Sequence, residues 1–148
     1  MKIAIGSDHA GVEAKGRIKT LLATLGHEVD DCGTNDETSV DYPDFAAPVS
    51  SAVASGAVQR GILVCGTGIG MSISANKHAG VRAAKCNDPY EAQMCRAHND
   101  ANVLCLGARV VDGSVMEEIV TGFLDTEFEG GRHARRVDKM MGGSSTPA

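Results

Sequence analysis

Short apolar runs alternate along this chain with segments whose apolar residues recur at helical spacing. The run at residues 3–5 precedes a helical stripe that continues to Leu25 and stops at Gly26, which suits a helix C-cap, and a strand follows around Val29. The alternation continues, with strands expected at residues 62–65, 81–85 and 102–106 and helices at 42–55, 69–78, 89–96 and 114–124. Strands separated by helices favour a parallel sheet covered on both faces. The sequence therefore predicts a Rossmann-like, three-layer α/β/α sandwich around a mainly parallel five-stranded sheet.

Length and charge limit the organisation and the partners of the chain. Its 148 residues suit one domain with a substantial core, which we assign to residues 1–141. The charged stretch 127–141 is expected to form a helix that reaches beyond the domain, and residues 142–148 to form a disordered tail. A net charge of −5 argues against a general attraction to nucleic acid or membrane surfaces, so any anion site must be local.

Cysteine and histidine usage indicates a reducing compartment and a site without metal. The chain has five cysteines and no C-x-x-C pair, an odd set that is typical of reduced, intracellular proteins. The N-terminus lacks the longer apolar stretch of a signal peptide, and no apolar run approaches membrane-spanning length. We therefore expect a cytoplasmic protein. The histidines and cysteines show no closed ligand spacing, so we expect no metal.

Polar residues follow three of the predicted strands at the points where those strands end. They are Gly6–His9, Cys65–Gly68 and Gly107–Arg109. Ligands of open α/β sheets bind outside the carboxyl ends of the strands, and parallel strands present these ends at one edge. We therefore expect the three segments to meet at one rim and to form the functional site.

The segment Cys65–Gly70 places a thiol between a strand and the start of a helix. Unpaired N–H groups at a helix start can hold an anion and can favour a thiolate, which makes Cys65 the first catalytic candidate. The alternative is an ordinary buried thiol beside a tight glycine turn. Dinucleotide binding fits less well, because Met71 stands where a third glycine or an alanine is needed and Asp88 precedes Pro89 as a plausible helix N-cap.

Other polar candidates each have a structural alternative. Asp8 could cap a helix or contact a sugar hydroxyl, and its charge argues against a phosphate beside it. His98 could be a histidine stabilised at a helix C-terminus or an acid–base group near neutral pH. The cluster that contains Arg132, His133 and Arg136 could be a solvated helix face or an anion site.

Four stretches, read in order, carry a resemblance to one family: Gly6–Gly11, Cys65–Ser72, Asn76–Lys77 and Arg96–Leu104. Together they strongly resemble ribose-5-phosphate isomerase type B, a family that includes allose-6-phosphate isomerases and galactose-6-phosphate isomerase subunits. The resemblance extends over nearly the whole chain. It implies cofactor-independent interconversion of D-ribose 5-phosphate and D-ribulose 5-phosphate through a cis-enediolate.

The resemblance also implies roles for individual residues. Cys65 matches the base of the cysteine-type members; other members use a glutamate farther along, where this chain has no acid at residues 69–72. His98 matches the residue that opens the furanose ring, and Thr67 a hydroxyl that shuttles protons. The expected substrate-binding residues are Asp8, His9, Tyr42, Gly66, Gly68, Ile69, Gly70, Asn99, Arg109, Arg132, His133 and Arg136. Of these, the resemblance implies that Arg109, Arg132, His133 and Arg136 hold the phosphate, that Asn99 contacts the sugar and that the Gly66–Gly70 backbone forms the anion hole.

The resemblance implies a partner as well. In this family a C-terminal segment crosses to the neighbouring subunit, so a homodimer with shared active sites, or a tetramer of such subunits, is expected. Isomerisation of allose 6-phosphate or galactose 6-phosphate is the main alternative. A sugar-phosphate or nucleotide sensor without turnover is the alternative from another class.

Overall fold

The protein is represented by a computed structural model, and residues 1–143 are described. Its sheet has five parallel strands in the order β2-β1-β3-β5-β4. The strands are β1 (Lys2–Ser7), β2 (Glu28–Asp31), β3 (Arg60–Cys65), β4 (Ala83–Lys85) and β5 (Val103–Gly107). The predicted five-stranded parallel sheet is confirmed. The expected tail at residues 144–148 lies outside the described residues.

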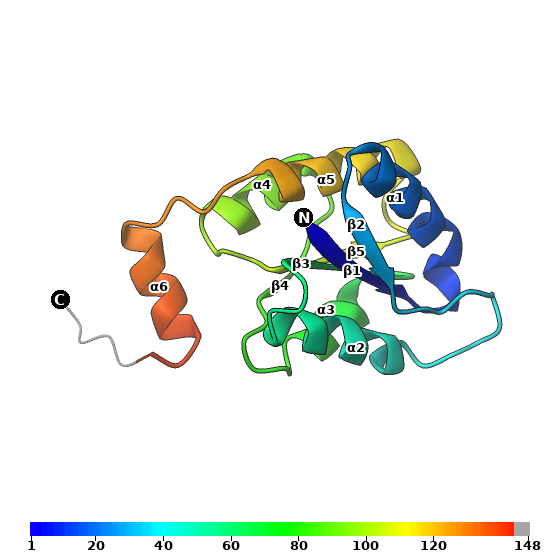
Figure 1. Ribbon diagram of the computed structural model, residues 1–148, viewed down its shortest axis with the longest axis horizontal. Coiled ribbons are helices and arrows are strands. Elements are labelled where there is room, and N and C mark those ends of the chain that lie inside the picture. Colours follow the sequence, from blue (N-terminus) through cyan, green and yellow to red (C-terminus); the bar gives the residue numbers. More distant parts are fainter. Residues whose placement is uncertain (144–148) are drawn as a thin grey trace.

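Helices cover both faces of the sheet, as Figure 1 shows. On one face lie α1 (Val12–Thr24), α4 (Pro89–Ala97) and α5 (Gly113–Asp125), and on the other α2 (Tyr42–Ala54) and α3 (Ile69–Ala75). A short 3-10 turn, η1 (His9–Gly11), precedes α1. The carboxylate of Asp88 accepts the Glu91 N–H at 2.8 Å and so caps α4, as expected of an aspartate before Pro89.

Two apolar clusters form the core, one on each side of the sheet. Successive side chains of a strand point to opposite faces, so Ile5 packs towards α1 and α5 while Ala4 packs towards α2. Phe123 of α5 is completely buried in the first cluster, and Met71 of α3 is completely buried in the second. Because the central strands β1, β3 and β5 are covered on both faces, they contain unbroken apolar runs, whereas the edge strand β2 is polar and partly exposed.

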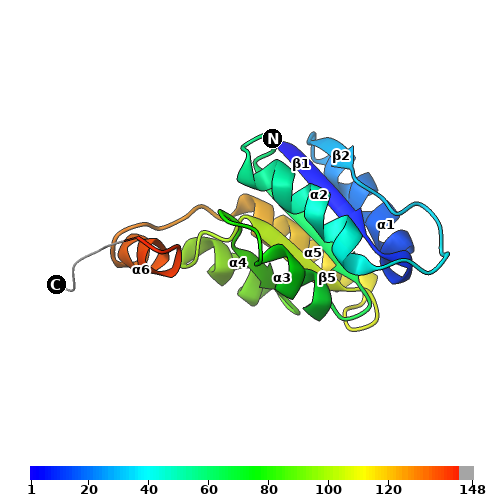
Figure 2. The same cartoon turned by 90° about the horizontal axis from the view of Figure 1, so that it is seen from below.

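Two helices are shorter than the sequence suggested. The helix expected at residues 69–78 ends at Ala75, because the Asn76 side chain turns back and pairs with both the N–H and the carbonyl of Ala83, at 2.8 and 2.9 Å. The charged stretch after residue 126 is helical only in α6 (Arg132–Met140), after Gly130 and Gly131 in left-handed conformations with φ of 68° and 55°. Figures 1 and 2 show α6 standing off from the sandwich.

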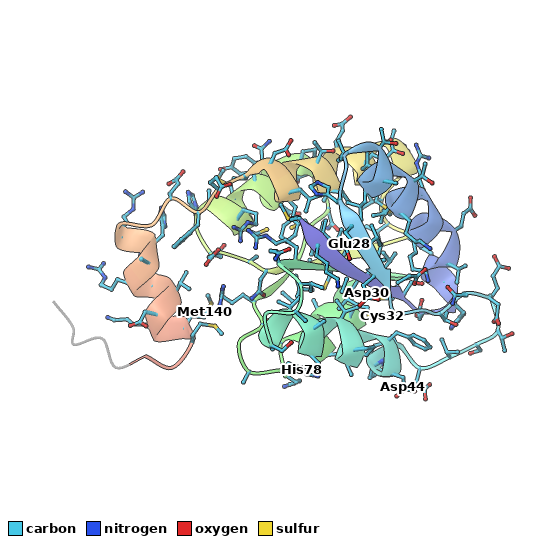
Figure 3. All side chains as sticks on the ribbon, in the orientation of Figure 1. Glu28, Asp30, Cys32, Asp44, His78 and Met140 are labelled. Carbon is cyan, nitrogen blue, oxygen red and sulfur yellow. The ribbon has the colours of Figure 1, made fainter. Side chains whose placement is uncertain are left out.

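An ion-pair cluster attaches the edge strand β2 to helix α1. Asp31 lies between Lys15 and Lys19, and each ammonium is 2.7 Å from one carboxylate oxygen. Burial opposes ionisation of Asp31, but hydrogen bonds from both lysines and from the Gly33 N–H outweigh it and lower its pKa to about 2. The neighbouring residues Glu28, Asp30 and Cys32 lie along the same stretch of the edge (Figure 3).

We expect Asp31→Asn to lower the free energy of unfolding by about 2 kcal/mol near neutral pH, because it removes the charge that both lysines bind. The folded-state pKa lies below the ordinary value of 3.8, so this stabilisation is present above about pH 4 and is lost as pH falls towards 2. Urea denaturation across this range measures it, with the exposed Asp30→Asn as control. A constant difference between wild type and Asp31→Asn at all pH values would contradict the ion-pair assignment.

Candidate active site

The carboxyl ends of β1, β3 and β5 are joined by direct backbone contacts. The N–H of Asp8 donates to the Val64 carbonyl at 3.1 Å, and the N–H of Ala108 donates to the Cys65 carbonyl at 2.9 Å. The Asp8 carboxylate accepts the Ala10 N–H at 2.9 Å, so Asp8 caps η1. The three polar segments that follow these strands therefore share one rim.

The glycine loop after β3 folds back onto the Cys65 thiol. Cys65 is 4% exposed, and its Sγ accepts the Gly68 N–H at 3.1 Å. Gly68 has a φ of +79°, which an L side chain rarely adopts, and an added Cβ would lie 2.9 Å from the Leu106 carbonyl carbon. The Ile69 N–H is directed at Thr67 Oγ1 at 3.2 Å. The backbone N–H of Gly68 thus holds the Cys65 sulfur in a fixed place at the start of α3.

Arg109 and Tyr42 lie against the same loop. The Arg109 N–H donates to the Gly66 carbonyl at 3.0 Å, and an added Cβ on Gly66 would lie 3.1 Å from the guanidinium Nη1. The Tyr42 ring lies over Gly70, where an added Cβ would be 2.6 Å from Cζ. The loop is therefore bordered by a cation on one side and by a phenol on the other.

His9 enters the rim with a defined tautomer. Its Nδ1 accepts the Val40 N–H at 3.2 Å. A ring nitrogen that accepts a hydrogen bond carries no proton, so the neutral ring has its proton on Nε2. His9 is half-buried beside Asp8 and is thus prepared to donate a hydrogen bond from Nε2 to a ligand at the rim.

The second group of expected site residues gathers around α6. The rings of His98 and His133 stack with centroids 4.2 Å apart, and Glu129 Oε2 is 3.9 Å from His98 Nε2 and 3.5 Å from His133 Nε2. Burial lowers the pKa of His133, with further lowering from His98 and Arg132. A cavity of about 270 Å³ opens here, and its lining includes His98, Asn99, His133 and Arg136.

The residues around Cys65 and those around His98 lie at opposite ends of the parallel strands, the carboxyl edge and the amino edge of the sheet. Cys65 pairs with Gly107 at the carboxyl edge, whereas His98 precedes β5, whose first residue Val103 pairs with Gly61 at the amino edge. The four residue-to-residue steps from Val103 to Gly107 span roughly 13 Å of the sheet. A single chain therefore does not bring Cys65 and His98 together.

Glu129 was not among the residues that the sequence singled out. Its only signal is its position four residues before His133, a spacing that brings two side chains together only if the chain turns there. With His98 and His133 it forms a group whose ligand atoms lie within 4.8 Å of one another and could hold a metal ion. No single sequence spacing predicts this group, because His98 directly follows α4, His133 belongs to α6 and Glu129 lies in the segment between α5 and α6.

A thiol at a glycine loop, and imidazoles beside guanidiniums, are groups that support acid–base catalysis on an anionic ligand. Together with the fold, they indicate an α/β enzyme. The comparison with known families is more specific. The Ribose/Galactose Isomerase family matches residues 3–140, nearly the whole chain. The chain belongs to this family and is an isomerase. Within residues 1–143, no helix is both long and apolar enough to span a membrane.

Relatives match over nearly their full lengths. Ribose-5-phosphate isomerase B of Escherichia coli is 50% identical over 137 residues, which cover 93% of this chain and 92% of that protein. D-erythrulose-4-phosphate isomerase of Pectobacterium atrosepticum is 46% identical over 142 residues, with 95% and 93% covered. The solved structure of Clostridium thermocellum ribose-5-phosphate isomerase B is 54% identical, with a TM-score of 0.95 over 96% of each chain.

We expect Gly68→Ala to destabilise the protein by about 2–4 kcal/mol, because the new Cβ meets both an unfavourable backbone conformation and the backbone of β5. Gly56→Ala is a matched control, since Gly56 has the same φ of +79° but an added Cβ would have nothing within 4 Å. It should cost only about 1–2 kcal/mol. Equal losses for the two variants in urea denaturation would show that the contact with β5 contributes nothing.

Proposed function

We propose that this isomerase interconverts D-ribose 5-phosphate and D-ribulose 5-phosphate through a cis-enediolate, with Cys65 as the base. The observation that carries the proposal is the Gly68 N–H directed at Cys65 Sγ, at the carboxyl edge where α/β sheets bind ligands. Relatives named ribose-5-phosphate isomerase B, about half identical over almost the entire length, support the substrate pair.

The proton transfer follows from the groups at the rim. The Cys65 thiolate takes the proton from C2 of the open-chain aldose, and the C1 carbonyl becomes an enediolate oxygen. The same thiol then returns the proton to C1 while the C2 oxygen becomes the new carbonyl. The Thr67 hydroxyl moves a proton between the O1 and O2 positions, so no proton is gained or lost overall. No external oxidant or reductant is required.

Charge develops on oxygen in this step, and fixed donors stabilise it most effectively when they are in place beforehand. We infer that the backbone of residues 66–70, at the start of α3, supplies such donors, while the N–H groups of Gly68 and Ile69 hold Cys65 Sγ and Thr67 Oγ1 in place. Arg109 adds a positive charge beside Gly66. His9 and Asp8 contact sugar hydroxyls, His9 as donor through Nε2 and Asp8 as acceptor.

The second group of residues completes the site from a neighbouring copy of the chain. His98 would open the furanose ring as an acid–base group, Asn99 would contact the sugar, and Arg132, His133 and Arg136 would hold the phosphate. Since these residues lie at the other edge of the sheet from Cys65, we propose a homodimer in which each site combines both edges. The exposed Ile69 and Ile73 of α3 and the projecting α6 support such a contact.

The cellular setting is part of the same proposal. All five cysteines are free thiols, and Cys65 works only when it is reduced. We therefore propose that the enzyme acts in the cytoplasm.

We expect Cys65→Ala to reduce isomerisation of D-ribose 5-phosphate by at least about 10²–10⁴-fold, because the base is lost while the binding groups remain. The assay uses excess EDTA, so that turnover also tests for independence from metal. Cys32→Ala is the control, because Cys32 is a half-buried thiol directly after the edge strand β2. Its rate of isomerisation should stay near that of wild type. Appreciable residual turnover by Cys65→Ala would remove Cys65 as the base.

The same assay settles the substrate. D-erythrulose 4-phosphate belongs in the panel because a 46% identical relative is named for it, with allose 6-phosphate and galactose 6-phosphate as hexose tests. Turnover of one of these without turnover of D-ribose 5-phosphate would replace the proposed substrate. Binding of D-ribose 5-phosphate without conversion would favour a sensor.

A mixture of two inactive variants tests the shared site. Cys65→Ala and His98→Asn homodimers should each be nearly inactive, but reassorted subunits form heterodimers in which one of the two sites carries neither substitution. Random exchange makes roughly half of the dimers hybrid, so about one quarter of wild-type activity should return. Mixing without any recovery, after mass spectrometry has shown that subunits exchanged, would contradict a site shared between subunits.

A further inference from the structure

Lys15 is a buried cation on the inner side of α1. The residue is only 2% exposed, and lysines are almost never buried to this degree unless they are paired. Its Nζ donates to Asp31 Oδ1 at 2.7 Å, to the Thr34 carbonyl at 2.6 Å and to Asn35 Oδ1 at 3.0 Å. These contacts use all three hydrogens of the ammonium group. The three acceptors belong to the end of β2 and to the chain that follows it.

Two of these acceptors lie in the β2–α2 segment, residues 32–41, which is the cyan loop at the right of Figure 1. The start of this segment is also attached to the end of β1. The Ser7 N–H donates to the Gly33 carbonyl at 2.7 Å, and the Thr34 N–H donates to the Ser7 carbonyl at 2.8 Å. Lys15 thus fixes the segment at the point where it leaves the sheet.

The far end of the β2–α2 segment reaches the candidate active site twice. Val40 supplies the N–H that holds His9 Nδ1, and the segment leads directly into Tyr42, whose ring lies over Gly70. A connecting segment samples fewer conformations when its first residues are held in place, so the anchored start restricts where Val40, close to its far end, can lie.

We propose that Lys15 is a positioning residue of the active site: it anchors the β2–α2 segment so that the Val40 N–H keeps the His9 proton on Nε2, facing the substrate. The effect on catalysis rests on the proposed function, whereas the effect on His9 does not. A lysine is suited to this task because its one ammonium group binds the Asp31 carboxylate of β2 and two oxygens of the segment, from Thr34 and Asn35. An apolar side chain of similar length could fill the space but could not hold these oxygens.

Lys19 provides a matched comparison. It donates to the other oxygen of the same carboxylate, Asp31 Oδ2, at 2.7 Å, but its side chain is 41% exposed. Its Nζ has no hydrogen bond to the β2–α2 segment among the contacts within residues 1–143. If Lys15 acted only by stabilising the fold through Asp31, Lys19 would have the same role. Only Lys15 also holds the β2–α2 segment in position.

The test compares Lys15→Met and Lys19→Met in the full-length protein by two measurements. Nitrogen-15 NMR of the imidazole rings near pH 8, with His9 assigned from a His9→Asn spectrum, reports the tautomer. We expect His9 to hold its proton on Nε2 in wild type and Lys19→Met and to become a mixture of tautomers in Lys15→Met. For isomerisation of D-ribose 5-phosphate, kcat/KM should fall about 10- to 100-fold in Lys15→Met and stay within about twofold of wild type in Lys19→Met.

An unchanged His9 tautomer in Lys15→Met, or equal losses in both variants, would overturn the proposal. If Lys15→Met does not fold, Asn35→Ala replaces it, because this change removes one anchor of the segment and leaves the Lys15–Asp31 pair intact; a partial shift of the His9 tautomer is then expected, and no shift counts against the proposal. The NMR measurement needs no substrate. Absence of ribose 5-phosphate turnover would therefore refute the proposed function without deciding the role of Lys15.

Discussion

Close backbone contact at the carboxyl edge of the sheet is the constraint on which the site depends. Three glycines allow it: an added Cβ would lie 2.8 Å from the Val64 carbonyl oxygen at Gly11, 2.9 Å from the Leu106 carbonyl carbon at Gly68 and 2.6 Å from the Thr67 carbonyl oxygen at Gly107. Any side chain at these positions would separate the ends of β1, β3 and β5. The loop could then no longer fold back so that the Gly68 N–H meets the Cys65 sulfur.

The parallel topology divides the functional groups of one chain between two edges. Parallel strands collect the residues that follow them at one edge, and the residues that precede them at the other. Cys65 and His9 belong to the first kind, whereas His98 belongs to the second. The projecting helix α6 adds guanidiniums and His133 near His98 but lies far from the glycine loop along the chain. This division between two ends of the strands is the reason for proposing a site shared by two copies of the chain.

The fold was largely predictable from local patterns. Apolar runs, helical stripes and signals such as Asp88-Pro89 predicted nearly every element, because propensity, periodicity and capping all agreed. What local patterns did not predict includes contacts that one side chain makes at a distance. Asn76 ends its helix because it pairs with Ala83, and Lys15 lies on an apolar helix face because its partners come from another strand and loop. A lysine on an otherwise apolar stripe was the available signal for the latter.

The layered α/β/α architecture, the thiol and glycine loop after the third strand, and the family resemblance can all be predicted from the sequence, because they depend on residues that are near neighbours in the chain. Three relations are visible only in the folded chain: Val40 sets the tautomer of His9, Glu129 lies beside two stacked imidazoles, and His98 is remote from Cys65 in its own chain. These are relations between residues from different elements. Strand order and packing determine them, and neither is encoded in local spacing.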